Sequence, residues 1–182
     1  EIIVKRDMTI AKYVNTPIHL THISTKGSVE SIGEMKKKYD LITCDTCPHY
    51  FTLTDRATLS FDTNTKVNPP LRSKEDVKAI KEGLREEIID IIATDHAPHD
   101  LTSKDVEFDI ASSGISGLET ALGLSMALVH EGVLSMSMLI KKFTENPAKL
   151  LNLPYGGLAH GDAADIIVFD PDYEWTVDKS NF

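Results

Sequence analysis

The sequence predicts an α/β protein, part of a (β/α) barrel with a small β domain attached. Two observations carry this prediction. Three apolar stretches of strand character are each followed by a segment with helical periodicity, the order that builds parallel sheets. Residues 154–182 instead contain glycine punctuation and two alternating segments, which favour a separate small sheet and leave residues 1–153 to the barrel. An open doubly wound sheet fits the three units as well, so the elements alone leave both architectures open.

The N-terminal part is expected to alternate helix and strand. Apolar residues at helical spacing predict a helix over residues 2–14, which Pro17 stops, and residues 18–23 then have the pattern of a short strand. A second amphipathic helix is expected over residues 28–38, followed by a strand over residues 41–47. These two units have the alternation of a βαβ fold.

The middle of the chain contains the strongest strand pattern. Residues 65–68 form a short extended piece that two prolines stop. Ser73, with Asp76 three residues later, predicts a capping box that opens a helix to about Leu84. Residues 88–94 are β-branched and almost continuously apolar, as expected of a parallel strand buried on both faces.

Helices dominate the segment that follows, and the tail differs. We expect helices over residues 117–130 and 135–143, then a short helix that Asn146 caps. Residues 165–170 and 173–177 alternate apolar and polar side chains, which predicts paired strands of the small β domain.

Composition limits the classes of function. The 182 residues include 19 basic and 28 acidic ones, and the formal net charge of −9 argues against a nucleic-acid or anionic-membrane surface. No apolar run approaches the roughly 20 residues that a membrane-spanning helix needs. The two cysteines, Cys44 and Cys47, make no disulfide framework, so a reducing cytoplasm is expected. A redox role for this pair is disfavoured because Cys44 lies inside a strand pattern rather than at a helix start.

Polar clusters follow three predicted strands, at residues 21–24, 46–50 and 94–99. In either architecture, active sites lie at the carboxyl ends of parallel strands. His22 and Asp95 close two of these strands, and imidazole and carboxylate are ligands that zinc prefers. Asp95 follows an apolar run, where an unpaired carboxylate is costly unless a cation or donor meets it. For His22 a hydrogen-bonded structural role is the alternative.

Three further places could contact a polar or anionic substrate. His99 lies on the loop after Asp95, and Asn68 precedes two prolines that lock its main chain extended. Residues 112–117 precede a helix and offer backbone N–H groups to an anion. The structural alternatives are an exposed loop histidine, a turn dictated by proline and an ordinary helix start.

Five ordered motifs resemble those of the dihydroorotases of the amidohydrolase superfamily, in the longer, bacterial-type branch. They are H-L-T-H-I-S-T at residues 19–25, C-D-T-C-P-H-Y-F-T-L at 44–53 (C-E-V-T-P-H-H-L-x-L in the family), K-V-N-P-P-L-R-S at 66–73, A-T-D-H-A-P-H at 93–99 and G-I-S-G-L-E-T-A at 114–121. The tail resembles the closing pattern of the family, with T-E-N-P-A at 144–148 and G-D-A-A-D at 161–165.

This resemblance implies an enzyme of pyrimidine biosynthesis that reversibly cyclises N-carbamoyl-L-aspartate to L-dihydroorotate with one or two zinc ions. It implies that His22 and Asp95 are metal ligands at the ends of the sixth and eighth strands of a TIM barrel, and that Asp95 is also the general acid/base. The positions that it matches to substrate contacts are Asn68, His99, Ser113 and Gly114.

Two departures keep alternatives open. Tyr50 stands where the family has the second histidine of P-H-H, and Asp45 where it has glutamate. Because P-H-Y is similar to allantoinases, an allantoinase or hydantoinase is the alternative enzyme. A non-catalytic dihydroorotase-like scaffold subunit is a further alternative, although the presence of His22 and Asp95 favours an enzyme.

The resemblance also implies groups that the chain lacks. The family uses an H-x-H pair, a bridging Asp or carboxylated Lys and a further His, all upstream of the motifs found here, and no H-x-H occurs in the sequence. The chain begins at Glu1 without an initiator methionine or signal-peptide order. We therefore expect a C-terminal fragment with about the last three βα units and part of the small β-sandwich domain, inactive alone. A homodimer and association with aspartate transcarbamoylase are the expected assemblies.

Overall fold

The computed structural model describes residues 1–153, 160–161 and 163–178, and within them three strands form one parallel sheet. The strands are β1 (Ile18–Leu20), β2 (Ile42–Thr46) and β3 (Ile91–Ile92), and their order is β1-β2-β3. The register pairs Leu20 with Cys44 and Thr46 with Ile92. The predicted α/β fold with a parallel sheet is confirmed.

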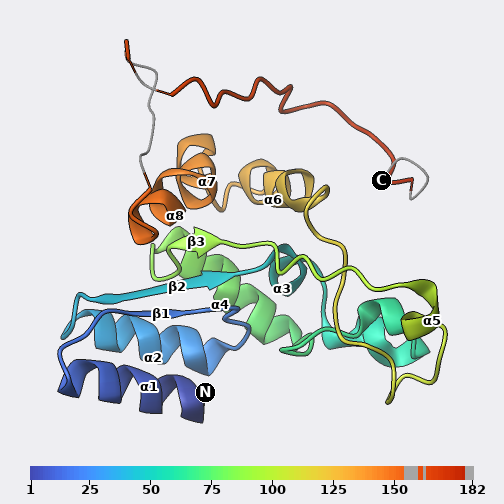
Figure 1. The fold of residues 1–182 in the computed structure, drawn as a ribbon, viewed down its shortest axis with the longest axis horizontal. Helices are drawn as coiled ribbons and strands as arrows, with labels where there is room; N and C mark the ends of the chain where they lie inside the picture. Colours follow the sequence, from blue (N-terminus) through green and yellow to red (C-terminus); the bar gives the residue numbers. More distant parts are fainter. Residues whose placement is uncertain (154–159, 162, 179–182) are drawn as a thin grey trace.

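Helices connect and cover these strands (Figure 1). Helices α1 and α2 lie beside β1, while α7 contacts β3 and packs against α6 and α8. The helices are α1 (Ile2–Tyr13), α2 (Lys26–Lys36), α3 (Pro48–Thr52), α4 (Lys74–Arg85), α5 (Leu101–Lys104), α6 (Ala121–His130), α7 (Met136–Phe143) and α8 (Glu145–Leu150). Two 3-10 helices, η1 (Asp55–Ser60) and η2 (Thr63–Thr65), lie in the connection between α3 and α4. No helix among the described residues is both long and apolar enough to cross a membrane.

Most helix ends follow local capping chemistry. The capping box predicted for α4 is present: the Ser73 hydroxyl accepts from Asp76 N at 3.3 Å, and the Asp76 carboxylate accepts from Ser73 N at 3.2 Å. Thr25 caps α2, so this helix begins two residues earlier than predicted. The predicted cap of α8 is wrong, because Thr144 takes the N-cap position while Asn146 donates to the carbonyl of Asp90 at 2.7 Å.

The strand expected over residues 88–94 is shorter than its apolar pattern suggested. Only Ile91 and Ile92 are strand residues, although Asp90 N and Ala93 N also bond to β2 carbonyls. Ile89 instead donates its N–H to the carbonyl of Gly83, which ties it to the end of α4. The apolar run therefore serves both the strand and the preceding turn.

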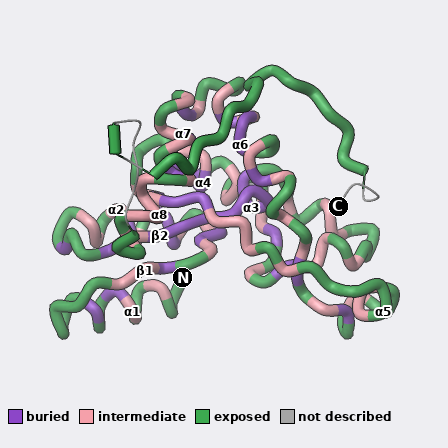
Figure 2. The backbone as a smooth tube through the Cα atoms, turned by 45° about the horizontal axis from the view of Figure 1, so that its top comes forward, coloured by how far each residue is buried: buried purple, intermediate pink, exposed green. Residues whose placement is uncertain are grey.

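The core lies where the sheet meets its helices. Figure 2 shows buried residues along the strands and the inner helices, whereas the C-terminal tail is exposed. The core cluster brings together apolar side chains of α2, α4, β3 and α7, and its fully buried members include Ile32, Ile80, Leu84, Ile92 and Leu139. Burial of these side chains is the main stabilising contribution to the fold.

The predicted strands of the tail are absent. Residues 163–178 contain no strand, so the pairing of residues 165–170 with 173–177 is wrong in this structure. A two-stranded ribbon is marginal in water without a third strand or a helix to cover its apolar face, and here Val168 remains 93% exposed. The predicted domain boundary between residues 153 and 154 borders residues that the structure does not describe. It therefore stays a prediction.

Asp90 connects several elements at the amino end of β3. Its carboxylate accepts from Lys36 Nζ at 2.8 and 2.6 Å and from the backbone N–H of Cys44 at 2.8 Å. Its carbonyl accepts from Asn146 Nδ2. One residue thus joins α2, β2, β3 and α8, on the edge of the sheet opposite to His22 and Asp95.

We predict that Asp90→Ala lowers the free energy of unfolding by about 1.5–3 kcal/mol, the usual range for hydrogen bonds that involve a charged group. The substitution leaves the N–H of Cys44 and the ammonium of Lys36 without their acceptor. Urea unfolding of the full-length protein, followed by circular dichroism, measures the change. Asp40→Ala removes an exposed carboxylate before β2 and is the matched control. Equal unfolding midpoints for the two variants would contradict this role.

Candidate active site

The carboxyl ends of β1 and β3 bring His22 and Asp95 together. His22 lies two residues after β1 and Asp95 three residues after β3, on either side of β2. His22 Nδ1 is 3.8 Å from Asp95 Oδ2, and the two side chains are 28% and 25% exposed. The pair that the sequence singled out is therefore close together and open to solvent.

Both residues have left-handed backbone conformations, with φ of 58° at His22 and 48° at Asp95. Such conformations are uncommon for residues other than glycine, and they cost free energy unless the surrounding structure holds them. They turn the chain sharply at the two strand ends. Strain of this kind occurs at ligand-binding positions, and the same conformation is also found outside the site at Asn15, Phe61, Glu87 and Asn152.

Asp45 holds the His22 turn in place. Its Oδ1 accepts from the backbone N–H of His22 at 2.7 Å, and its Oδ2 lies 2.9 Å from His19 Nε2. His19 Nδ1 in turn lies 2.7 Å from Thr43 Oγ1. Asp45 is 4% exposed, so this buried carboxylate fixes the chain that carries His22. The sequence marked Asp45 only as a change from glutamate and did not assign it this role.

Cys47 and His49 follow β2 and lie between the other two strand ends. Cys47 is fully buried and His49 is 5% exposed at the start of α3. The Nε2 atom of His49 is buried and has no hydrogen-bond partner. Burial, together with the nearby His22, lowers the pKa of His49 to about 4, so its imidazole is neutral at pH 7. Burial also raises the pKa of the Cys47 thiol well above its usual range.

These side chains fit a divalent metal ion. Donor atoms of His22, Asp45 and Cys47 lie within 4.8 Å of one another, and so do those of Cys47, His49 and Asp95. Neutral imidazole and carboxylate are the donor types of zinc sites, and a buried imidazole nitrogen without a partner is consistent with a missing ligand. His22 and Asp95, which the sequence singled out as metal ligands, each belong to one of these two groups.

His99, Ser113 and Gly114 form a second group. His99 Nε2 lies 3.1 Å from the carbonyl oxygen of Ser113. Gly114 has φ of 151°, and a Cβ atom there would lie 2.6 Å from the Ala97 carbonyl oxygen and 2.8 Å from His99 Nε2. Only glycine therefore allows this close approach of the two loops. Among the described residues, no hydrogen bond or ion pair joins His99 to His22 or Asp95.

Asn68 is exposed on a neighbouring loop. The carbonyl of Lys66, two residues earlier, accepts from Gly114 N at 2.9 Å, so this loop is tied to the His99 group. The buried Tyr50 donates its hydroxyl to the carbonyl of Pro69 at 2.6 Å. Tyr50 thus supports the turn that follows Asn68.

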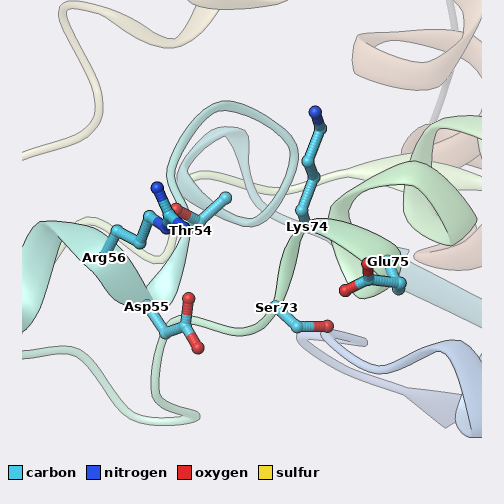
Figure 3. Close-up of a pocket in the computed structure, with 6 residues that line it drawn as sticks. All are labelled: Thr54, Asp55, Arg56, Ser73, Lys74 and Glu75. Carbon is cyan, nitrogen blue, oxygen red and sulfur yellow. The ribbon is translucent and has the colours of Figure 1, made fainter.

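A separate hollow lies between η1 and the start of α4 (Figure 3). Its volume is about 430 Å³, and its lining comprises Thr54, Asp55, Arg56, Ser73, Lys74 and Glu75. Charges of both signs surround it, and none of the predicted site residues line it. We assign it no role in the chemistry.

Known proteins resemble this chain in both sequence and structure. The chain is 52% identical over 182 residues to the dihydroorotase of Syntrophus aciditrophicus and 53% identical over 180 residues to that of Trichlorobacter lovleyi. These alignments include 100% and 99% of this chain but only 43% and 42% of the relatives' length. Its fold superposes on the L-hydantoinase (dihydropyrimidinase) from Arthrobacter aurescens with a TM-score of 0.91 at 29% identity, covering 98% of this chain and 41% of that one.

The family model described as the amidohydrolase family matches residues 6–182, which is nearly the whole sequence. The resemblance to dihydroorotases drawn from the five motifs is confirmed by relatives that carry that name. With the His22–Asp95 pair at the strand ends and the family match over almost its full length, the chain belongs to the amidohydrolase family.

Proposed function

We propose that this chain supplies part of the active site of a dihydroorotase, which reversibly closes N-carbamoyl-L-aspartate to L-dihydroorotate. The observation that carries the proposal is the approach of His22 and Asp95 to 3.8 Å at the ends of two strands of one parallel sheet. Relatives about half identical to the chain are named dihydroorotases, which supports this substrate over other cyclic amides. In this proposal the sheet belongs to a (β/α)8 barrel and residues 154–182 to a separate small domain.

Zinc is the metal that we propose for the site, because imidazole and carboxylate suit it and the family is metal-dependent. When bound, such an ion supplies Lewis-acid polarisation of the substrate amide carbonyl. His22 and Asp95 are two of its ligands, and the others come from outside this chain. The left-handed turns at both residues hold these donors at the sheet edge before any ligand arrives.

Asp95 is the proposed proton carrier. In ring opening, its carboxylate takes a proton from the attacking water while a bond forms between the water oxygen and the amide carbon. It then delivers this proton to the departing ring nitrogen as the C–N bond breaks. Ring closure follows the reverse order. The partial exposure of Asp95 leaves its carboxylate accessible to both the water and the substrate.

The group of His99, Ser113 and Gly114 is proposed to hold the substrate. Because the Ser113 carbonyl can only accept, the hydrogen lies on His99 Nε2, and Nδ1 is left for the substrate. When the imidazole is protonated, Nδ1 donates to a substrate carboxylate in a charge-assisted hydrogen bond. Asn68, on the loop tied to Gly114, offers its amide to the ring.

An allantoinase or hydantoinase is the second candidate, favoured by P-H-Y at residues 48–50 and by the superposition on L-hydantoinase. The structural position of Tyr50 weakens this candidate. Its hydroxyl donates to Pro69 O and its ring is buried. Tyr50 therefore supports a turn and is not available to select the substrate. Identity to the dihydroorotases is also much higher, at 52% against 29%.

Assembly belongs to the proposal as well. The family resemblance implies a homodimer and, in some members, a complex with aspartate transcarbamoylase. Light scattering of the full-length protein, alone and mixed with aspartate transcarbamoylase, measures both masses directly.

We predict that Asp95→Asn in the full-length protein lowers turnover of dihydroorotate on the order of 10³-fold or more, because it removes a ligand charge and the proton carrier. The change in absorbance on ring opening measures turnover, and circular dichroism checks the fold. Asp105→Asn, on the exposed loop after α5, is the matched control. Near-normal turnover by the Asp95 variant would remove this residue from the mechanism.

His99→Ala is predicted to weaken substrate use while the metal content stays unchanged. Loss of a hydrogen bond that involves a charged group costs about 1.5–3 kcal/mol, which is a decrease in kcat/KM of roughly 10- to 150-fold. Steady-state kinetics and elemental analysis give the two quantities. His130→Ala, a partly exposed site on α6, is the control. Loss of stoichiometric metal from the His99 variant would show that the role assignment is wrong.

The same kinetics, run with allantoin and hydantoin beside dihydroorotate, distinguish the two candidate enzymes. The proposal expects the highest kcat/KM for dihydroorotate. A higher value for either of the other cyclic amides would replace dihydroorotase by the second candidate.

A further inference from the structure

Two side chains beside the His22–Asp95 pair have no part in the proposed reaction. These are Cys47, at the end of β2, and His49, in the first turn of α3. Together with Asp95, their donor atoms form a group in which every pair of atoms lies within 4.8 Å. None of the motif positions assigned to metal or substrate includes either residue.

His49 gives the independent sign that this group takes a ligand. Its side chain is 5% exposed, and Nε2 is a buried ring nitrogen without any hydrogen-bond partner. Native structures leave few buried polar atoms unpartnered, because each one costs about 1–3 kcal/mol. A ring nitrogen of the same imidazole lies within 4.8 Å of a thiol and a carboxylate, so a partner for this group must bind three donors of different types. A metal ion meets this requirement.

We propose that Cys47, His49 and Asp95 form a site for a thiophilic divalent cation such as Cd²⁺, beside the catalytic metal position and sharing Asp95 with it. A thiolate and an imidazole together favour soft and borderline ions over hard ones such as Mg²⁺. In a tetrahedral site, donors that are 2.0–2.3 Å from the ion lie roughly 3.3–3.8 Å from one another. Because the donor atoms lie within 4.8 Å of one another, the group needs to contract by about 1.5 Å at most to reach this separation.

Binding of the cation replaces the thiol proton of Cys47 by the metal ion. The S–H bond of Cys47 breaks, its proton passes to water, and a sulfur–metal bond forms without any change of oxidation state. The second cysteine does not compete for the ion. Cys44 is the middle residue of β2, and its thiol donates to the carbonyl of Ile88 at 3.2 Å. The two buried cysteines therefore make a matched pair for a test.

Occupation of this site has a consequence for the chemistry, which rests on the proposed function. With one carboxylate oxygen on the catalytic metal and the other on the second cation, Asp95 has no oxygen left for proton transfer. We therefore expect the ion to inhibit ring opening even when the catalytic metal is in place.

The test uses full-length protein loaded with its catalytic metal and titrated with CdCl₂. Absorption from thiolate to cadmium charge transfer reports a Cys ligand, and elemental analysis counts the bound ions. We expect the band in the natural protein and in Cys44→Ser, and its loss in Cys47→Ser. Removal of one direct ligand is expected to weaken Cd²⁺ binding by about tenfold or more, since even outer-shell changes weaken metal affinity by 10–100-fold.

Cys47→Thr serves as a second variant in case serine disturbs the fold, because threonine stands at this position in the family pattern that residues 44–53 resemble. Absence of the band from the natural protein, or its survival in both Cys47 variants, would overturn the site. Activity is recorded in parallel: the Cd²⁺ concentration for half inhibition should rise about tenfold or more in the Cys47 variants. A protein that shows the band but no dihydroorotase activity would contradict the proposed function and support the metal site.

Discussion

The parallel register of three short strands determines where the candidate site residues that follow these strands lie. Because β1, β2 and β3 run in the same direction, their carboxyl ends meet at one edge, and pairing of Leu20 with Cys44 and of Thr46 with Ile92 aligns the polar segments that follow. A shift of one residue in either ladder would reverse the faces of the side chains and separate His22 from Asp95. The helices that pack against the strands in the core cluster stabilise this register.

The amino ends and the carboxyl ends of the strands carry different kinds of polar groups. At the amino edge, Asp90 is paired with Lys36, and the buried Lys142 donates to Ile89 O at 2.6 Å. Burial lowers the pKa of Lys142, but its hydrogen bond compensates part of the loss of solvation. At the carboxyl edge, His22 and Asp95 adopt left-handed conformations and His49 Nε2 has no partner. Paired polar groups thus stabilise the amino end, while the buried ring nitrogen without a hydrogen-bond partner marks the carboxyl end as a place for ligands.

Asp45 links the fold to the site. It belongs to β2, where its backbone pairs with β3, and its carboxylate holds the His22 turn that follows β1. A strand residue therefore fixes a loop conformation that would otherwise be unfavourable for histidine. Cys47 and His49 follow the same strand, and donor atoms of Cys47 lie within 4.8 Å of both His22 and Asp95, while those of His49 lie within 4.8 Å of Asp95.

The sequence by itself determined the α/β class, most helices, the capping box at Ser73 and the pairing of His22 with Asp95, because these depend on local periodicity and on motifs that follow strands. It overestimated the strand before Asp95 and predicted strands in the tail, since apolar alternation does not report whether a covering partner is present. It put residues 46–50, with Cys47 and His49, at a predicted active-site position but assigned Asp45, Cys47 and His49 no role in the site. Only the tertiary structure brought these side chains together, because burial and distances between residues of different strands arise when the sheet pairs, and no local pattern encodes them.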